Sequence, residues 1–182
     1  MSWSNLPSPC APRPTDVVLK EVTLDIDWKD LEAIKRLKYK YQRCLDTKEW
    51  DELRECFTED ATAAYSSGKF SFDGREAILK FLEGAMGADS FHSSHVVSQP
   101  EIDFVDERHA TGRWCLQDCV IDTSFDMIIR GAAFYEDEYR KGDDDVWRIS
   151  KTGYRRTYEE MLPRKSIEGL TLTESRWQPK GS

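Results

Sequence analysis

The order of the periodic segments limits the fold of this chain more than any other feature. Apolar residues recur at spacings of three and four within residues 27–57 and 75–86, which is typical of amphipathic helices. Between residues 91 and 158 the pattern changes to long strands separated by short turns. A parallel sheet would require helices between these strands, so we expect them to be antiparallel. The sequence therefore predicts an α+β domain in which a curved sheet wraps around a helix.

Two short helices are expected to open the domain as a hairpin. Asp27 is placed to cap the first helix, and Thr47 is placed to cap the second, which should end before Glu59. The first helix would bury the stripe Leu31, Ile34, Leu37, Tyr41 and Cys44, and the second would place Trp50, Leu53, Cys56 and Phe57 on one side. The expected strands are residues 61–65, 70–72, 92–98, 102–105, 110–122, 125–139 and 146–158.

The length of the chain, 182 residues, suits one domain with tails and is enough to bury about 70% of the unfolded surface. We expect an arm rich in Pro and Ser at residues 1–26, the domain at 27–163 and a tail at 164–182. The net charge of −8 would repel a polyanion, so no nucleic-acid partner is expected. No run of about 18 apolar residues and no apolar signal-peptide core is present, so we expect a cytoplasmic protein without a membrane partner.

The cysteines and histidines argue against disulfides and metal. The five cysteines are an odd number without a Cys-x-x-Cys pair, which favours free thiols at Cys10, Cys44, Cys56, Cys115 and Cys119. Cys44 could line a pocket, although a small buried hydrophobic residue is the more common role. His92 and His95 are three residues apart in an expected strand and so lie on opposite faces, where they cannot ligate one ion. No metal is expected.

Tyr41, Asp46 and His95 carry the groups needed to move a proton without metal or cofactor. Tyr41 and Asp46 are five residues apart, which on a continuous helix turns them about 140° from each other. They can converge only if the helix ends near Asp46, whose carboxylate could then orient an imidazole through its ring N–H. The residues alone leave two structural alternatives open: His95 as a core histidine and Asp46 as a helix-end aspartate.

A second polar group is expected on the sheet. Asp118 shares its strand face with apolar neighbours, so its carboxylate must be paired, protonated or functional. Arg156 is the obvious partner. It alternates with Tyr154 and Tyr158, which would form either an ion-pair ladder or a polar wall on one strand face. The basic pair Arg164 and Lys165 follows, and this region could meet an anionic substrate group or be a solvated surface cluster.

Seven stretches in collinear order carry a resemblance to a known family. They are AIKRLKYKYQRCLD, WDEL, AAYSSGKFSF, PEID, ATGRWCLQD, GAAFYEDEY and TGYRRTYEE, within residues 30–161. Together they resemble the SnoaL-like branch of the NTF2-like superfamily, and within it the bacterial bile-acid 7α-dehydratases. The resemblance implies a cone, in which a curved antiparallel sheet wraps around helices and an interior pocket (an NTF2-like or cystatin-like fold). The arm, the tail and most of the segment HSSHVVSQ fall outside the resemblance.

The resemblance also implies roles for particular residues. Asp46 and His95 would be the catalytic pair, joined by Tyr41, while Tyr65, Asp118 and Arg156 would bind substrate. The implied reaction removes water from a 7α-hydroxy-3-oxo-4-ene steroid without a cofactor. The substrate would be a bile acid, free or as a coenzyme A thioester, and the protein a homotrimer. The alternatives are another SnoaL-like isomerase, dehydrochlorinase or cyclase, or a non-catalytic ligand-binding or structural subunit.

Overall fold

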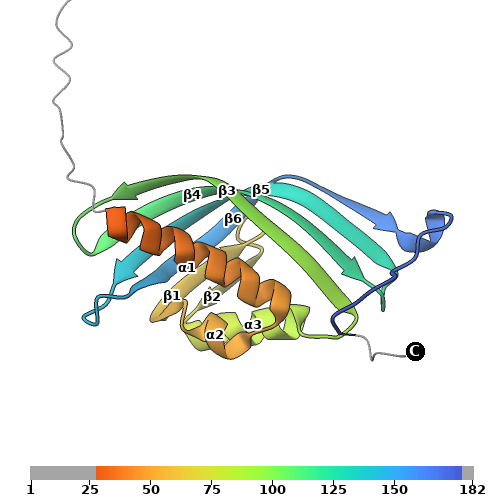
Figure 1. The fold of residues 1–182 in the computed structure, drawn as a ribbon, viewed down its shortest axis with the longest axis horizontal. Helices are drawn as coiled ribbons and strands as arrows, with labels where there is room; N and C mark the ends of the chain where they lie inside the picture. Colours follow the sequence, from red (N-terminus) through yellow and green to blue (C-terminus); the bar gives the residue numbers. More distant parts are fainter. Residues whose placement is uncertain (1–27, 178–182) are drawn as a thin grey trace, which may run out of the picture.

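The computed structural model describes residues 28–177, so the N-terminal arm, Asp27 and Cys10 lie outside the described residues. Within these residues the chain forms three α-helices and six strands (Figure 1). The helices are α1 (Trp28–Thr47), α2 (Trp50–Arg54) and α3 (Arg75–Met86), and a 3-10 helix, η1, spans Arg164–Ser166. The strands are β1 (Phe57–Tyr65), β2 (Phe70–Asp73), β3 (Phe91–Phe104), β4 (His109–Asp122), β5 (Met127–Lys141) and β6 (Trp147–Pro163).

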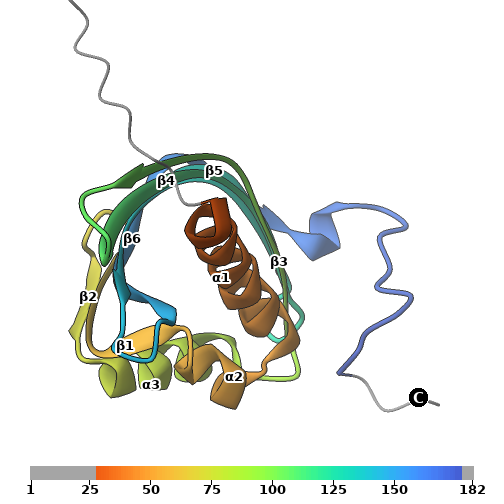
Figure 2. The ribbon, with the colours of Figure 1, turned by 60° about the vertical axis from the view of Figure 1, so that its left-hand side comes forward.

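One strongly curved sheet encloses α1. Its strand order is β2-β1-β6-β5-β4-β3. Strands β3 to β6 pair antiparallel, as predicted, whereas β1 joins β6 in parallel, which the sequence did not indicate. Figure 2 shows α1 inside the curve, with α2 and α3 beneath it and β3, β4 and β5 arching over it. The predicted α+β, NTF2-like cone is therefore confirmed. Within residues 28–177 no helix is long and apolar enough to cross a membrane.

The helix α1 is buried over a wider arc than its apolar stripe suggests. Ile34, Tyr41 and Cys44 of the predicted stripe are buried, but so are the polar residues Lys38 and Gln42. An exposed face would be expected for a helix covering one side of a flat sheet. Because this sheet curves around α1, side chains outside the apolar stripe are also removed from water.

The second helix is shorter than predicted, and Thr47 is not its cap. Thr47 belongs to the last turn of α1, where its Oγ1 donates to the Arg43 carbonyl at 2.7 Å. Glu49 occupies the N-cap position of α2. The predicted helical residues Cys56 and Phe57 lie outside α2, because β1 begins at Phe57, opposite Ile149 of β6. Apolar residues at 53, 56 and 57 fit a helix locally, but pairing with β6 decides the conformation.

Two bulges alter the predicted strands. Residues 92–98 and 102–105 belong to one strand, β3, which is bulged between Ser98 and Glu101; Gln99 has a φ of 51° and Pro100 follows. In β6 the register shifts so that Arg156 lies opposite Ala133, whereas Tyr158 lies opposite Ala132. Tyr158 therefore faces outward and is 56% exposed. The prediction that it shares a face with Arg156 was wrong.

The cysteines within residues 28–177 are free thiols, as predicted. Cys44 and Cys56 are fully buried, and burial raises the pKa of Cys44 to about 11 and that of Cys56 to about 12. A thiol of such high pKa is a poor nucleophile at neutral pH. Cys44 is therefore a core residue.

The segment after β6 returns to the end of α1. From η1 the chain runs back past the lower end of β3 (Figure 1). Trp177 reaches the loop after α1, where the Lys48 ammonium lies 4.3 Å from the centroid of the Trp177 ring. The described part of the predicted tail therefore packs against Lys48, two residues after Asp46 in the sequence. The tail itself falls outside the family resemblance.

Candidate active site

Asp46 and His95 form a closely held pair at the end of α1. His95 Nδ1 lies 2.6 Å from Asp46 Oδ1, and the His95 backbone N–H donates to Oδ2 at 2.8 Å. The hydroxyl of Ser93, on the same strand, donates to Oδ1 at 2.8 Å. The helix ends at Thr47, one residue beyond Asp46, as the sequence required, and Asp46 meets His95, although Tyr41 hydrogen-bonds neither of them within residues 28–177.

These hydrogen bonds fix both the charge of Asp46 and the tautomer of His95. Burial by itself raises the pKa of Asp46, but hydrogen bonds from His95 and Ser93 outweigh it, and the pKa lies below its ordinary value. An ionised carboxylate can only accept, so Nδ1 of His95 must carry the hydrogen. In the neutral ring Nε2 is then the basic nitrogen. A base oriented in this way is ready to remove a proton.

Asp118 and Arg156 form a second pair on the inner face of the sheet. Asp118, only 7% exposed, lies directly opposite His95 in the β3–β4 register. Arg156 Nη2 donates to Asp118 Oδ2 at 2.8 Å, and Nη1 donates to Oδ1. Burial lowers the pKa of Arg156, but hydrogen bonding to Asp118 overcomes this and raises it. The predicted partnership of Asp118 with Arg156 is therefore present in the fold.

Gly131 makes this second pair possible. It lies opposite Asp118 on β5, between the strands that carry the carboxylate and the guanidinium. A Cβ at this position would stand 3.1 Å from Arg156 Nη1 and 2.6 Å from the Tyr158 carbonyl oxygen. The missing side chain lets the guanidinium cross β5. His95, Asp118 and Arg156 consequently line one side of the cone.

Tyr41 and Tyr65 form a separate group deeper in the core. Their hydroxyls lie 3.3 Å apart, and both residues are buried. Burial raises the pKa of both phenols, so each stays protonated and can donate a hydrogen bond at neutral pH. Within the described chain no hydrogen bond joins either hydroxyl directly to His95 or Asp46. The six predicted residues thus form three pairs.

The chain matches the model of the SnoaL-like domain over residues 27–153. It belongs to the SnoaL-like family. A crystal structure of a candidate scytalone dehydratase from Novosphingobium aromaticivorans DSM 12444 is 30% identical, covering 72% of this chain and 87% of that one, with a TM-score of 0.67. The sequence resemblance to the family is therefore confirmed, whereas particular kinship with bile-acid 7α-dehydratases stays a prediction.

Two more distant structures share the fold of this SnoaL-like chain. Hexachlorocyclohexane dehydrochlorinase LinA-type3 from Novosphingobium barchaimii LL02 is 20% identical with a TM-score of 0.68, covering 80% of this chain and 95% of that one. A protein with a cystatin-like fold from Nostoc punctiforme PCC 73102 is 19% identical with a TM-score of 0.59, covering 72% and 93%. Structures named as a dehydratase and a dehydrochlorinase therefore share the fold of this chain.

The sequence did not reveal a buried ion pair in this SnoaL-like domain. Lys38 Nζ lies 2.7 Å from Asp137 Oδ2, and neither side chain is exposed to solvent. Asp137 also accepts hydrogen bonds from the hydroxyls of Tyr139 at 2.8 Å and Thr152 at 2.7 Å. The ammonium lies 3.3 Å from the ring centroid of Tyr135. One signal was available, because Asp137 alternates with Tyr135 and Tyr139 on an inward strand face.

One group of potential metal ligands lies within residues 28–177. Atoms of Cys44, Glu49 and Glu52 lie within 4.8 Å of one another. Arg43 pairs with both carboxylates, with Nη2 2.7 Å from Glu52 Oε1. Its guanidinium supplies the positive charge that a cation would bring. Arg43, Glu49 and Glu52 therefore form a surface ion-pair cluster beside the buried Cys44.

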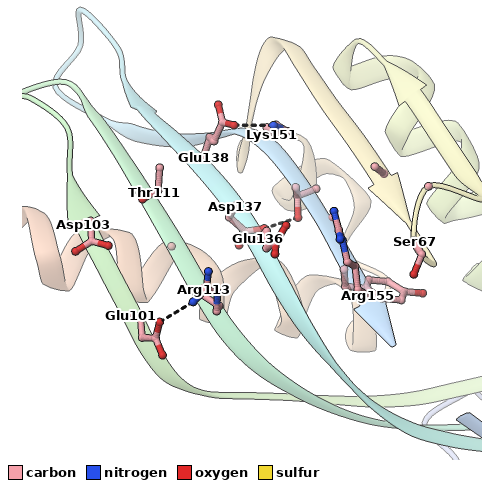
Figure 3. A pocket seen from close by; sticks show the side chains of 16 residues that line it. Ser67, Glu101, Asp103, Thr111, Arg113, Glu136, Asp137, Glu138, Lys151 and Arg155 are labelled. Atoms are coloured by element: carbon pink, nitrogen blue, oxygen red, sulfur yellow. Dashed lines mark hydrogen bonds and ion pairs between the residues drawn. The ribbon is translucent and has the colours of Figure 1, made fainter. Parts of the chain in front are cut away.

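A cavity of about 890 Å³ opens on the outer face of the sheet, away from the candidate pairs. Figure 3 shows charged side chains along it, including the ion pairs of Arg113 with Glu101 and of Lys151 with Glu138. Its lining includes none of the six predicted site residues. A groove of mixed charges offers little to an apolar ring system, so the candidate site stays on the inner face.

Proposed function

We propose that this protein is a cofactor-independent hydro-lyase that removes water from a 7α-hydroxy-3-oxo-4-ene steroid of the bile-acid type. The observation that carries the proposal is the orientation of His95, whose Nδ1 is held by Asp46 at 2.6 Å and whose Nε2 is left to act on a substrate. Membership of the SnoaL-like family and the dehydratase named among its neighbours support the reaction class. The steroid comes from the sequence resemblance.

His95 would act first as a base. In such a steroid, the hydrogen on the carbon between the double bond and the hydroxyl-bearing carbon is acidified by conjugation to the ketone. Nε2 of His95 takes this proton, and the electron pair moves into the conjugated system. The imidazolium that results is stabilised by the ionised carboxylate of Asp46. This is an acid–base step that requires no metal or redox group.

Tyr41 would stabilise the negative charge that develops on the substrate. Since its phenol stays protonated, it can donate to the ketone oxygen as that oxygen gains charge, or to the departing hydroxyl. Tyr65 shares a hydrogen bond with Tyr41 and would orient its hydroxyl. The Tyr41 and Tyr65 hydroxyls would therefore act as the hydrogen-bond donors of an oxyanion hole.

The same imidazole would complete the reaction. The proton and the hydroxyl leave from one face of the steroid, so the imidazolium can return its proton to the leaving oxygen. The C–O bond breaks, a second C=C bond forms, and water departs with the oxygen of the hydroxyl. His95 returns to its neutral form. A histidine suits both steps because an imidazole exchanges protons near neutral pH.

Asp118 and Arg156 would fix the polar side of the binding site. Arg156 is already paired with Asp118, so we expect it to position a polar substituent rather than act as an unpaired anion receptor. The acid side chain of the substrate would be carried free or as a coenzyme A thioester. We also propose a homotrimer, an assembly expected from the family resemblance.

The direct test is to incubate the purified protein with 7α-hydroxy-3-oxo-4-ene steroids, as free acid and as thioester. We expect the longer-wavelength absorption of the conjugated dienone to appear with enzyme and not with buffer. Mass spectrometry should show loss of one water. No absorbance change with either form would overturn the steroid assignment. A different product would identify another reaction of the family, such as isomerisation, and bound but unchanged steroid would favour a ligand carrier.

A further inference from the structure

Gln42 is a buried polar residue of α1 to which neither the sequence pattern nor the proposed mechanism gives a role. It lies midway in a row of three residues, Lys38, Gln42 and Asp46, spaced four apart and therefore on one side of the helix. At a rise of about 1.5 Å per residue, each neighbour is about 6 Å away along the axis. Lys38 pairs with Asp137 and Asp46 pairs with His95.

The carboxamide of Gln42, unlike the charged groups of Lys38 and Asp46, has no ion-pair or strong hydrogen-bond partner within residues 28–177. The residue is 3% exposed, and within the described chain neither Nε2 nor Oε1 makes a hydrogen bond of regular geometry. Leaving a buried polar group unpaired costs about 1–3 kcal/mol. Such a group is expected either to hold water or to await a ligand. Its position one turn before the catalytic aspartate favours the ligand.

The side chains around Gln42 also favour a ligand next to its amide. A weak hydrogen bond from its amide nitrogen to Tyr135 works against the burial that raises the pKa of that phenol, so the nitrogen has one imperfect partner, while the amide oxygen has none within residues 28–177. Tyr135 is itself buried and packs against Tyr41, with ring centroids 6.4 Å apart. A ligand in contact with Gln42 would therefore lie beside Tyr135 and one helical turn from Asp46.

We propose that Gln42 determines substrate specificity by hydrogen-bonding the hydroxyl group that leaves. This rests on the proposed dehydration. A carboxamide donates through nitrogen and accepts through oxygen, and a hydroxyl does both in return, so the two groups satisfy each other. The interaction selects substrates that carry a hydroxyl next to the carbon deprotonated by His95. As the C–O bond breaks, the amide N–H keeps its hydrogen bond to the departing oxygen.

The test compares two ligands and two side chains. The ligands are a 3-oxo-4-ene steroid with and without a 7α-hydroxyl, and their affinities are measured by isothermal titration calorimetry in a His95→Ala background, which prevents turnover. With Gln42 present, we expect the hydroxylated steroid to bind about 10-fold more tightly, the effect of one well-made hydrogen bond in a buried site. Gln42→Met, similar in size but unable to form the bond, should reduce this ratio to below about 2-fold.

Gln117 provides a matched control. It is exposed on β4, so Gln117→Met should leave the ratio unchanged. An unchanged ratio in Gln42→Met, or failure of both steroids to bind, would overturn the proposal for Gln42. Thermal unfolding without ligand gives a second readout, because replacing an unpaired buried amide by an apolar group should leave the midpoint equal or higher. A lower midpoint would mean that the amide is satisfied within the chain, and would also overturn the proposal.

The two proposals can fail separately. Dienone formation by the wild-type protein together with an unchanged ligand ratio would retain the dehydratase and remove Gln42 from substrate recognition. A ratio that depends on Gln42 without any dienone would retain Gln42 as the residue that reads the hydroxyl and remove the elimination.

Discussion

His95→Ala is expected to lower kcat for dienone formation by at least about 100-fold while leaving the fold intact. The loss corresponds to removal of a positioned general base, which contributes typically 10²–10⁴-fold. The fold should survive because the imidazole makes its hydrogen bond at the edge of the core, and Asp46 keeps the hydrogen bonds from Ser93 and from the backbone N–H of residue 95. Stopped-flow absorbance with the 7α-hydroxy-3-oxo-4-ene steroid measures the rate, and circular dichroism checks the fold.

His92→Ala is the matched control for this prediction. His92 belongs to the same strand but lies opposite Ile121, whereas His95 lies opposite Asp118, so the two side chains point to different faces. Its loss should change kcat by less than about 3-fold, because the His92 ring lies on the other face of the strand from the base, and its buried nitrogens make no hydrogen bond within residues 28–177. Activity of His95→Ala within 10-fold of the wild type would remove His95 from the mechanism without affecting the fold assignment.

The sequence was most informative where one residue must satisfy two constraints. Asp46 had to stand at a helix end and near an imidazole, and the fold provides both, with α1 ending at Thr47 and His95 at 2.6 Å. Asp118 was placed on an inward strand face by alternation, and its burial required a partner, which Arg156 supplies. Alternation and the cost of burying charge are local rules, so they predict such residues without knowledge of the whole fold.

The sequence was least informative where the tertiary structure reverses a local rule. Lys38 and Gln42 would be assigned to the solvated side of an amphipathic helix, yet both are buried because the sheet curves around α1. Tyr158 would face inward with Arg156 if β6 were regular, but a shift in pairing turns it out. Neither the curvature nor the bulge is encoded in a short window of sequence. Two of the residues that now matter most, Lys38 and Gln42, were missed for this reason.

The Lys38–Asp137 pair should dominate the stability of the cone. Burial lowers the pKa of the Lys38 ammonium, and the charge of Asp137 only partly opposes this. The pair holds α1 to β5, and through the hydroxyl of Thr152 it also reaches β6. Removing one member of a buried pair is far more costly than removing both, because a lone charge remains in the core.

Asp137→Asn is expected to lower the free energy of unfolding by about 3–5 kcal/mol, the usual cost of breaking a buried ion pair. One of the hydroxyls of Tyr139 and Thr152 keeps an acceptor in the amide oxygen, and the other can accept from the amide N–H, so the loss reports mainly on the unpaired Lys38. The folded-state pKa of Lys38 should fall further below its unfolded value of about 10.4. Between these two values the unfolded chain binds a proton that the folded chain does not, so stability should rise with pH. Urea unfolding at pH 7 and pH 9 measures both effects.

The exposed ion pair of Lys151 with Glu138 is the control that shows whether the loss of stability depends on burial of the pair or only on loss of an ion pair. Its atoms are also 2.7 Å apart, but both side chains are about half exposed. Glu138→Gln should therefore change the free energy of unfolding by less than about 1 kcal/mol. Adding Lys38→Met to Asp137→Asn removes the unpaired ammonium and should restore part of the lost stability, with a coupling energy of about 3 kcal/mol. Equal losses in Asp137→Asn and Glu138→Gln, or strictly additive losses in the double variant, would mean that the buried pair does not hold α1 inside the sheet.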